Sequence, residues 1–237
     1  MKRPGEPGLK DRISQLLEAR GLRQGAAAPI ESLLGSLSEE HAPTAVKDPE
    51  EGLNIHVADS LSAFDLPVLP ECRVIADIGS GCGVPGLVIA ATLPTASVTA
   101  VESIGRKCDF IRSSAEAAGL ANVQVVNCRA EEWSDGIGSC DAVLARALAP
   151  LPVLAEYAAP LLRDGGVLVA WKGSPSADEV EAGSVAAAKL GLEVASPITV
   201  EPWPGSGGRK LFVMRKVAPT PAGYPRRAGM ASKRPLA

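Results

Sequence analysis

The chain has 237 residues, of which 46% are hydrophobic and 22% charged, the balance of a globular protein with a sizeable core, so wholesale disorder is excluded. No apolar run reaches the roughly 18 residues of a membrane helix, and none follows the basic start as in a secretory signal, so we expect no membrane association. Five cysteines, an odd number without CxxC spacing, argue against a disulfide framework and a zinc site and fit the reducing cytoplasm.

Charge is distributed unevenly along the chain. The formal net charge is −3, but residues 202–237 contain eight Lys or Arg and no Asp or Glu. Residues 1–201 therefore carry 16 basic and 27 acidic side chains. An acidic body with a basic tail is expected of a protein that binds a polyanion, although a solvated tail that only aids solubility gives the same pattern. Charge alone leaves both interpretations open.

The first third of the chain is helical in pattern. Apolar residues recur at helical spacing between residues 9 and 17, before Gly21, and again between residues 30 and 37, after Pro29. A third helical stretch, residues 48–64, begins with Asp-Pro-Glu-Glu, which combines a capping side chain, a first-turn proline and acids at the positive helix end. We therefore expect residues 1–66 to form a small helical subdomain.

From residue 73 onward, short apolar runs alternate with helical stretches. The predicted strands are residues 74–78, 98–101, 123–127, 142–144, 167–171, 192–200 and 211–215, and the predicted helices are 87–93, 106–118 and a stretch that runs to residue 162. Buried strands separated by helices indicate βαβ units, whereas the glycine-rich residues 205–208 indicate a hairpin between the last two strands. We predict an α/β fold in residues 67–217, with a mostly parallel seven-stranded sheet and an antiparallel C-terminal hairpin. A basic irregular tail follows, residues 218–237.

The most informative segment is the loop between the first predicted strand and its helix, residues 77–86 (DIGSGCGVPG). Its alternate glycines let the backbone turn tightly and approach a ligand without a Cβ in the way. Pro85 stands where the first turn of a helix tolerates proline, so the free N–H groups of that helix would point at the ligand. The loop reads both as GxGxG and, from Gly81, as the GxGxxG of dinucleotide-binding proteins. A tight turn without a ligand is the third interpretation.

Two acids near this loop favour one ligand. Asp77 directly precedes the glycines, where a carboxylate suits an amino-bearing ligand and repels a pyrophosphate. Glu102 ends the next strand, where its carboxylate can accept hydrogen bonds from both ribose hydroxyls of an adenosine. S-adenosylmethionine (AdoMet) carries an ammonium, a sulfonium and a ribose, and no phosphate. We therefore favour AdoMet, while the overlapping GxGxxG keeps an NAD-dependent Rossmann oxidoreductase as an alternative.

Several separated motifs resemble the RsmG (GidB) family of bacterial enzymes that methylate N7 of a guanine in the 530 loop of 16S ribosomal RNA. They cover about residues 44–237. One departure lies upstream, because the family's W-N-x-x-x-N-L-T is reduced here to Thr44. The matching segments are residues 44–51 (TAVKDPEE), 56–61 (HVADSL), 77–86, 102–107 (ESIGRK), 129–132 (RAEE), 146–147 (RA), 171–173 (WKG), 224–229 (YPRRAG) and 233–236 (KRPL).

The resemblance implies a Rossmann-like class I AdoMet-dependent methyltransferase. By resemblance, Gly79 and Val84 lie against the cofactor, Ala130 and Glu131 meet its adenine region, and Arg146 closes the far side. For Glu131 an exposed helix-start acid and for Arg146 a structural ion pair are the alternatives. The full set of expected cofactor-binding residues is Asp77, Gly79, Gly81, Gly83, Val84, Glu102, Ala130, Glu131 and Arg146.

Basic residues at strand ends and in the tail are the candidates for RNA phosphates. They are Arg129, Arg146, Lys172, Arg226, Arg227, Lys233 and Arg234. Any one of the last four, which lie in the tail, is equally well explained as a solvated side chain.

The implied chemistry needs no general base, because N7 of guanine carries a lone pair and no proton. Direct in-line transfer then depends on holding the two reacting atoms in contact and excluding water. We expect no catalytic base, so neither His41 nor His56 acts as one. Cys82 is expected to be only a small side chain in the loop, and we expect no metal. The expected partner is 16S rRNA, free or in the small subunit, and the expected state is a monomer. A non-catalytic RNA-binding assembly factor remains a further alternative.

Overall fold

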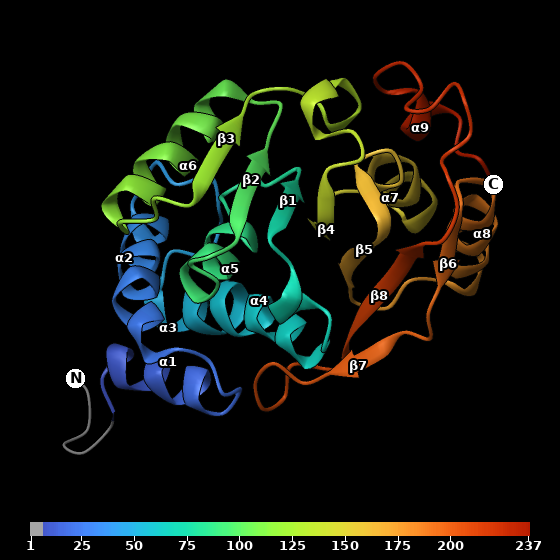
Figure 1. Ribbon diagram of the computed structural model, residues 1–237. Helices are drawn as coiled ribbons and strands as arrows, with labels where there is room; N and C mark the ends of the chain where they lie inside the picture. The colour runs from blue at the N-terminus through green and yellow to red at the C-terminus, as the bar shows by residue number, and fades with distance from the viewer. Residues whose placement is uncertain (1–6) are drawn as a thin grey trace.

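The computed structural model describes residues 7–237, so the first six residues of the expected N-terminal helical subdomain lie outside the described residues. Its centre is one mixed sheet in the order β3-β2-β1-β4-β5-β8-β6, with β7 pairing β8 (Figure 1). Strands β1 to β5 are parallel to one another, and β8 is antiparallel to β5, β6 and β7. The strands are β1 (Val74–Ile78), β2 (Ser97–Val101), β3 (Val123–Val126), β4 (Cys140–Arg146), β5 (Leu162–Lys172), β6 (Leu192–Val194), β7 (Ile198–Val200) and β8 (Arg209–Lys216).

The mostly parallel sheet and the C-terminal hairpin are confirmed, but the sheet has eight strands rather than seven. The additional strand arises because the stretch predicted over residues 192–200 is divided into β6 and β7, which pair in succession along β8. Pro197 lies in the break, where it has no N–H to donate to a neighbouring strand.

The parallel strands are apolar on both faces because helices cover both sides of the sheet. Alternate residues of β1 point to opposite cores: Ile75 packs in one cluster with Ile89 of α5, and Ala76 packs in the other with Leu154 of α7. The helices that follow the strands are α5 (Gly86–Thr92), α6 (Gly105–Ala117), α7 (Leu151–Ala158) and α8 (Ala177–Lys189). Figure 1 shows α5 and α6 on one side of the molecule, and α7 and α8 on the other.

One helical expectation for this part of the chain was wrong, and one helix was not predicted. Helix α7 ends at Ala158, and Leu162 already begins β5, because Pro160 has no N–H to continue the hydrogen bonds of the helix. Helix α8 was not predicted, since its inner face is made of small residues rather than a stripe of large apolar ones. Gly183 of that face lies so close to α7 that a Cβ would come within 2.7 Å of Leu151.

The N-terminal helices share a core with the sheet domain. Val57 of this region packs in the same cluster as Val88 of α5 and Phe110 of α6. The expected cap at residue 48 is present, since Asp48 accepts a hydrogen bond from the Glu51 N–H at 2.9 Å. The elements are α1 (Leu9–Glu18), η1 (Gln24–Ala26), α2 (Ala27–Ser38), α3 (Pro49–Gly52), the π-helix η2 (Leu53–Ala58), α4 (Asp59–Leu61), η3 (Ser62–Asp65) and η4 (Leu69–Glu71).

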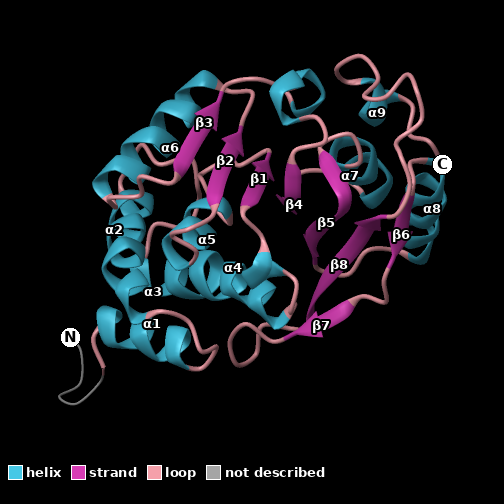
Figure 2. Ribbon diagram, viewed as in Figure 1, coloured by secondary structure: helices cyan, strands magenta, loops and turns pink. Residues whose placement is uncertain are grey.

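The C-terminal segment lies against α7 and is mostly loop (Figure 2). It contains one short helix, α9 (Met230–Lys233), in which Ser232 hydrogen-bonds the Tyr157 hydroxyl of α7 at 3.1 Å. The remaining short helices, η5 (Ala130–Glu132) and η6 (Ser134–Gly136), lie between β3 and β4. Within residues 7–237, no helix has both the length and the apolar character to cross a membrane.

Candidate active site

A cavity of about 510 Å³ lies at the carboxyl ends of the parallel strands, where open α/β sheets bind ligands. Its wall combines the glycine loop after β1, the ends of β2 and β4, the helical segment η2–α4 and the start of β8. The residues on the wall are Pro43, Ile55, Asp59, Gly79, Ser80, Gly81, Cys82, Val84, Glu102, Ser103, Lys107, Arg146, Ala147, Leu148 and Arg209.

The three alternating glycines of the loop have different neighbours, although all three have positive φ. A Cβ on Gly79 would come within 2.4 Å of Leu148, and a Cβ on Gly83 within 2.6 Å of Leu87. A Cβ on Gly81, by contrast, meets no atom of the described chain closer than the Gly79 carbonyl at 3.8 Å. Gly83 is therefore required by packing against the buried Leu87, whereas the neighbour of Gly79 is the outer end of the exposed Leu148 side chain. Gly81 leaves open space at the cavity.

Asp77 lies beneath the loop and is absent from the cavity wall. Its carboxylate accepts hydrogen bonds from the Ser80 hydroxyl at 2.5 Å and the Gly86 N–H at 3.0 Å. Burial is the main cause that raises the pKa of Asp77 to about 6, against these two hydrogen bonds. The acid that sequence analysis placed beside the ligand instead fixes the two ends of the loop.

Glu102 is buried but reaches the cavity, as expected. One carboxylate oxygen accepts from the Gly81 N–H and the other from the Ile104 N–H, both at 2.9 Å. Each oxygen retains a lone pair for a further donor. Glu102 thus orders the glycine loop and offers an acceptor at the cavity wall.

Arg146 leaves β4 and is held by the π-helix. Its guanidinium donates to the Ile55 carbonyl at 2.7 Å and to Asp59 at 3.0 Å, and approaches His56 Nδ1 at 3.3 Å. Arg146 thus forms the structural ion pair that was one of its two alternatives, and it also lines the cavity. Ala147 follows with a φ of 54°, and this turn places Leu148 over Gly79.

The hydrogen bonds of His56 define its tautomer. A guanidinium can only donate, so Nδ1 accepts from Arg146, and Nε2 carries the proton that it donates to the Thr44 hydroxyl at 3.1 Å. Burial, followed by the Arg146 charge, lowers the pKa of His56 to about 4, so the ring is neutral at pH 7. With both nitrogens engaged, His56 joins Thr44 to Arg146.

Asp59 and Arg209 are site residues that sequence analysis missed. Asp59 lies between the guanidinium groups of Arg146 and Arg209, and Arg209 in turn lies over the Trp203 ring, with 5.2 Å to its centroid. Asp59 follows His56 by three residues, one helical turn, within an apolar segment, and this spacing was the available signal. Arg209 has no comparable signal, because only the antiparallel direction of β8 brings its first residue to this edge.

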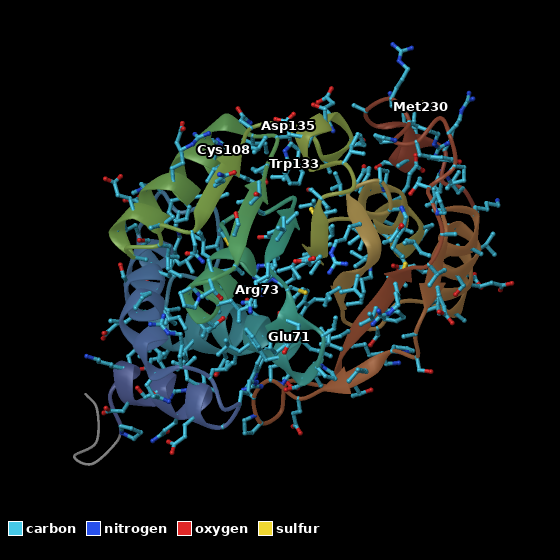
Figure 3. The ribbon with its side chains drawn as sticks, viewed as in Figure 1. Glu71, Arg73, Cys108, Trp133, Asp135 and Met230 are labelled. Carbon is cyan, nitrogen blue, oxygen red and sulfur yellow. The ribbon has the colours of Figure 1, made fainter. Side chains whose placement is uncertain are left out.

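The remaining expected cofactor residues lie outside the cavity wall. The Glu131 carboxylate accepts from the Gly229 N–H of the C-terminal segment at 2.8 Å, and Ala130 packs against the core cluster that contains Leu154 of α7. Figure 3 shows Trp133, which follows η5, and Met230 of α9 in the same upper part of the view. Glu131 therefore fastens the tail beside the loop that follows β3.

Apart from Arg146, which lines the cavity, the candidate RNA residues fall into two groups. Arg226 binds Glu156 of α7 through two hydrogen bonds, at 2.6 and 2.5 Å, and Lys172 pairs with Glu179 at 2.7 Å. These two serve the fold. The exposed members are Arg129, Arg227, Lys233 and Arg234.

Similar solved structures define the class of fold. A SAM dependent methyltransferase from Aquifex aeolicus matches with a TM-score of 0.54 at 14% identity, covering 79% of this chain and 98% of that one. Precorrin-6y C5,15-methyltransferase from Geobacter metallireducens matches with a TM-score of 0.52 at 20% identity, covering 66% and 87%. The expected class I AdoMet-dependent methyltransferase fold is thus confirmed.

Closer relatives define the family. Residues 31–201 match the family described as rRNA small subunit methyltransferase G. A protein of Rubrobacter xylanophilus named ribosomal RNA small subunit methyltransferase G is 43% identical to this chain over 196 residues, which cover 80% of this chain and 75% of that protein. A protein of the same name from Deinococcus radiodurans is 42% identical over 215 residues, which cover 88% of this chain and 84% of that protein. The chain belongs to the rRNA small subunit methyltransferase G family. The overlapping GxGxxG therefore does not mark an oxidoreductase.

The cavity fits AdoMet, the cofactor of this class. Gly81 leaves space that a Cβ would fill, and the buried carboxylate of Glu102 supplies an acceptor suited to ribose hydroxyls beside it. A volume of about 510 Å³ lies within the range of small-molecule sites. Within residues 7–237, no cluster of three or more His, Cys, Asp or Glu side chains could hold a metal ion.

Proposed function

We propose that the protein, as a monomer, methylates N7 of a guanine in the 530 loop of 16S ribosomal RNA, using AdoMet bound in the cavity beside the glycine loop. The relatives named ribosomal RNA small subunit methyltransferase G support the RNA substrate. The resemblance of the motifs to the RsmG family supports the N7 position.

The observation that carries the N7 assignment is the state of the titratable groups at the cavity. Glu102 accepts from two backbone amides, and Asp59 lies between two guanidinium groups. The nearby His56 ring is neutral with both nitrogens engaged, and burial raises the pKa of Cys82, so its thiol stays protonated. Methylation at N7 requires no proton transfer, and this arrangement is suited to it.

The residues then divide the work of binding and orientation. Bound AdoMet supplies an electrophilic methyl group. Gly81 allows the close approach of the ligand, Glu102 holds its ribose, and Arg146 closes the far wall. Leu148, which the turn at Ala147 places over Gly79, adds an apolar side chain to the cavity wall.

On the RNA side, the exposed cations carry the proposal. Arg227 and Lys233 lie on a segment that hydrogen bonds of Gly229 and Ser232 hold against the domain. The Gly229 hydrogen bond is to Glu131 of η5, and Arg129 directly precedes η5. Such a fixed group of cations contacts phosphates without ordering a free tail. Arg226 and Lys172 are not part of this group, because their charges are paired within the fold.

The test is product analysis. The protein is incubated with methyl-labelled AdoMet and small subunits, or their RNA, from cells that lack the modification, and the digested nucleosides are separated by mass spectrometry. We expect 7-methylguanosine at a single position. A product methylated at N1 or at the exocyclic amine, or no product at all, contradicts the proposal.

A further inference from the structure

An incomplete pair of polar groups lies on the cavity wall. The Asp59 side chain is only 2% exposed, and its Oδ2 accepts from Arg146, but within the described residues its Oδ1 has no hydrogen-bond partner. Arg209 Nε forms an ion pair with Oδ1 at 3.2 Å but is out of line for a hydrogen bond, so neither of these two atoms has a hydrogen-bond partner within the described residues. A buried acceptor and a buried donor, both at a ligand cavity, are explained if a ligand completes their hydrogen bonds.

The two groups differ in how they are held. Asp59 is fixed by the Arg146 guanidinium, which is itself tied to the Ile55 carbonyl. The Arg209 side chain is 34% exposed and rests over the Trp203 ring, so it can adjust its guanidinium to a ligand at the cavity. The cavity wall thus has a fixed carboxylate, Asp59, beside a guanidinium group, Arg209, whose N–H donors can change position.

The Watson–Crick edge of guanine is the complement of this pair. It carries two adjacent donors, N1–H and the N2 amino group, next to the acceptor O6. A carboxylate can accept from both donors, while an arginine donates to O6. Uracil offers a single donor on this edge, and adenine offers a donor and an acceptor, so neither satisfies both groups in the same way.

Recognition through this edge also leaves the reacting atom free. N7 belongs to the five-membered ring and takes no part in Watson–Crick pairing. A guanine held by Asp59 and Arg209 can therefore present N7 to the part of the cavity lined by Gly79 and Gly81.

We propose that Asp59 and Arg209 select the target nucleotide by binding the Watson–Crick edge of guanine. The inference rests on the proposed function, since it concerns the substrate of the same site. It makes Asp59 a specificity residue that touches the base, and gives Arg146 the further task of orienting Asp59.

The test changes one group on the substrate and one on the protein. Small subunits are prepared with inosine, which lacks only the N2 amino group, in place of the target guanosine, and kcat/KM is compared for the two substrates. We expect wild-type protein to prefer guanosine by roughly tenfold or more, since each good contact of this kind is worth about a factor of ten. In Asp59→Ala the activity on guanosine falls and the preference nearly disappears, because the partner of the amino group is gone.

Two further variants complete the design. Arg209→Met keeps a long side chain and removes the guanidinium, so activity falls on both substrates while the preference remains, because both carry O6. Asp65→Ala, which removes a nearby acid that pairs with Arg20 outside the cavity, leaves the preference unchanged. Should Asp59→Ala fail to fold, the wild-type preference and Arg209→Met still decide the question.

The failures are distinguishable. If wild-type protein forms 7-methylguanosine but methylates inosine equally well, or if Asp59→Ala retains the preference, the inference is wrong and the proposed function stands. If Asp59→Ala instead weakens AdoMet binding and leaves the preference intact, Asp59 holds the cofactor, and the inference is again wrong. If wild-type protein forms no 7-methylguanosine on the natural substrate, both are wrong.

Discussion

Replacing Arg226 by alanine should destabilise the protein far more than replacing its neighbour Arg227. Arg226 donates two hydrogen bonds to Glu156, which is 1% exposed on α7, and a third to the Arg234 carbonyl. Removal of Arg226 leaves a buried carboxylate without its partner, which costs about 3–5 kcal/mol in fully buried pairs. Because the Arg226 side chain is 24% exposed, water can reach the site, and we expect about 3 kcal/mol.

The assay is urea-induced unfolding of full-length protein. Arg227→Ala, at an exposed position on the same segment, should change the free energy of unfolding by about 0.5 kcal/mol or less. The loss in Arg226→Ala corresponds to roughly 6–12 °C in melting temperature for a domain of this size. The double variant Glu156→Leu with Arg226→Leu should recover most of the stability, because an apolar pair leaves no unpaired charge. A loss in Arg226→Ala within 1 kcal/mol of that in Arg227→Ala would refute this reasoning.

Further predictions concern the cofactor, pH and RNA. Gly81→Val should abolish AdoMet binding in calorimetry, because the side chain fills the space at the cavity. Gly21→Val is the control: Gly21 has the same φ of 63° and open space around it, so this variant should suffer only the backbone strain of about 1–2 kcal/mol. Equal AdoMet affinities of the two variants would contradict the loop assignment. Acidification from pH 6.5 to 4 should lower the stability through His56, because the unfolded state takes up the proton first. Between pH 6 and 3.8, Asp77 should raise the stability on acidification, because there the folded state takes up the proton first. Asp77→Asn should therefore steepen the acid loss seen in urea titrations, and an unchanged curve would argue against the raised pKa of Asp77. Arg227→Gln should lower the salt slope of RNA binding by about 0.7–0.9 without changing AdoMet affinity, and an unchanged slope would leave Arg227 merely solvated.

The parts of the fold that sequence analysis predicted are those with strong local patterns. Strand β1 is a short run that is apolar except for Asp77 and precedes a glycine loop, and the start of α3 shows its cap and first-turn proline directly. Helix α8 was missed because its buried face is made of Gly183, Ala186 and Ala187, whose small side chains do not form an apolar stripe. Periodicity reports where large apolar residues lie, and α8 packs by close approach instead.

At the candidate site, Gly81 and Glu102 were predicted because adjacent strand ends in a parallel sheet meet at one edge. The direction of each side chain was beyond the pattern, so Asp77 was expected at the ligand and lies under the loop. The contact between Asp59 and Arg209 joins residues 150 positions apart and depends on β8 running antiparallel. Pairings of this kind are set by topology, which no local motif records.

The position of β8 has a consequence for how the nascent chain completes its fold. Although β8 is the last strand to be synthesised, it lies inside the sheet between β5 and β6. Until residues 209–216 are available, β5 presents an unpaired edge that includes the apolar run 167–171, and β6 and β7 have no strand to join. A chain that stops before residue 209 therefore exposes a template for intermolecular strand pairing and is prone to aggregate.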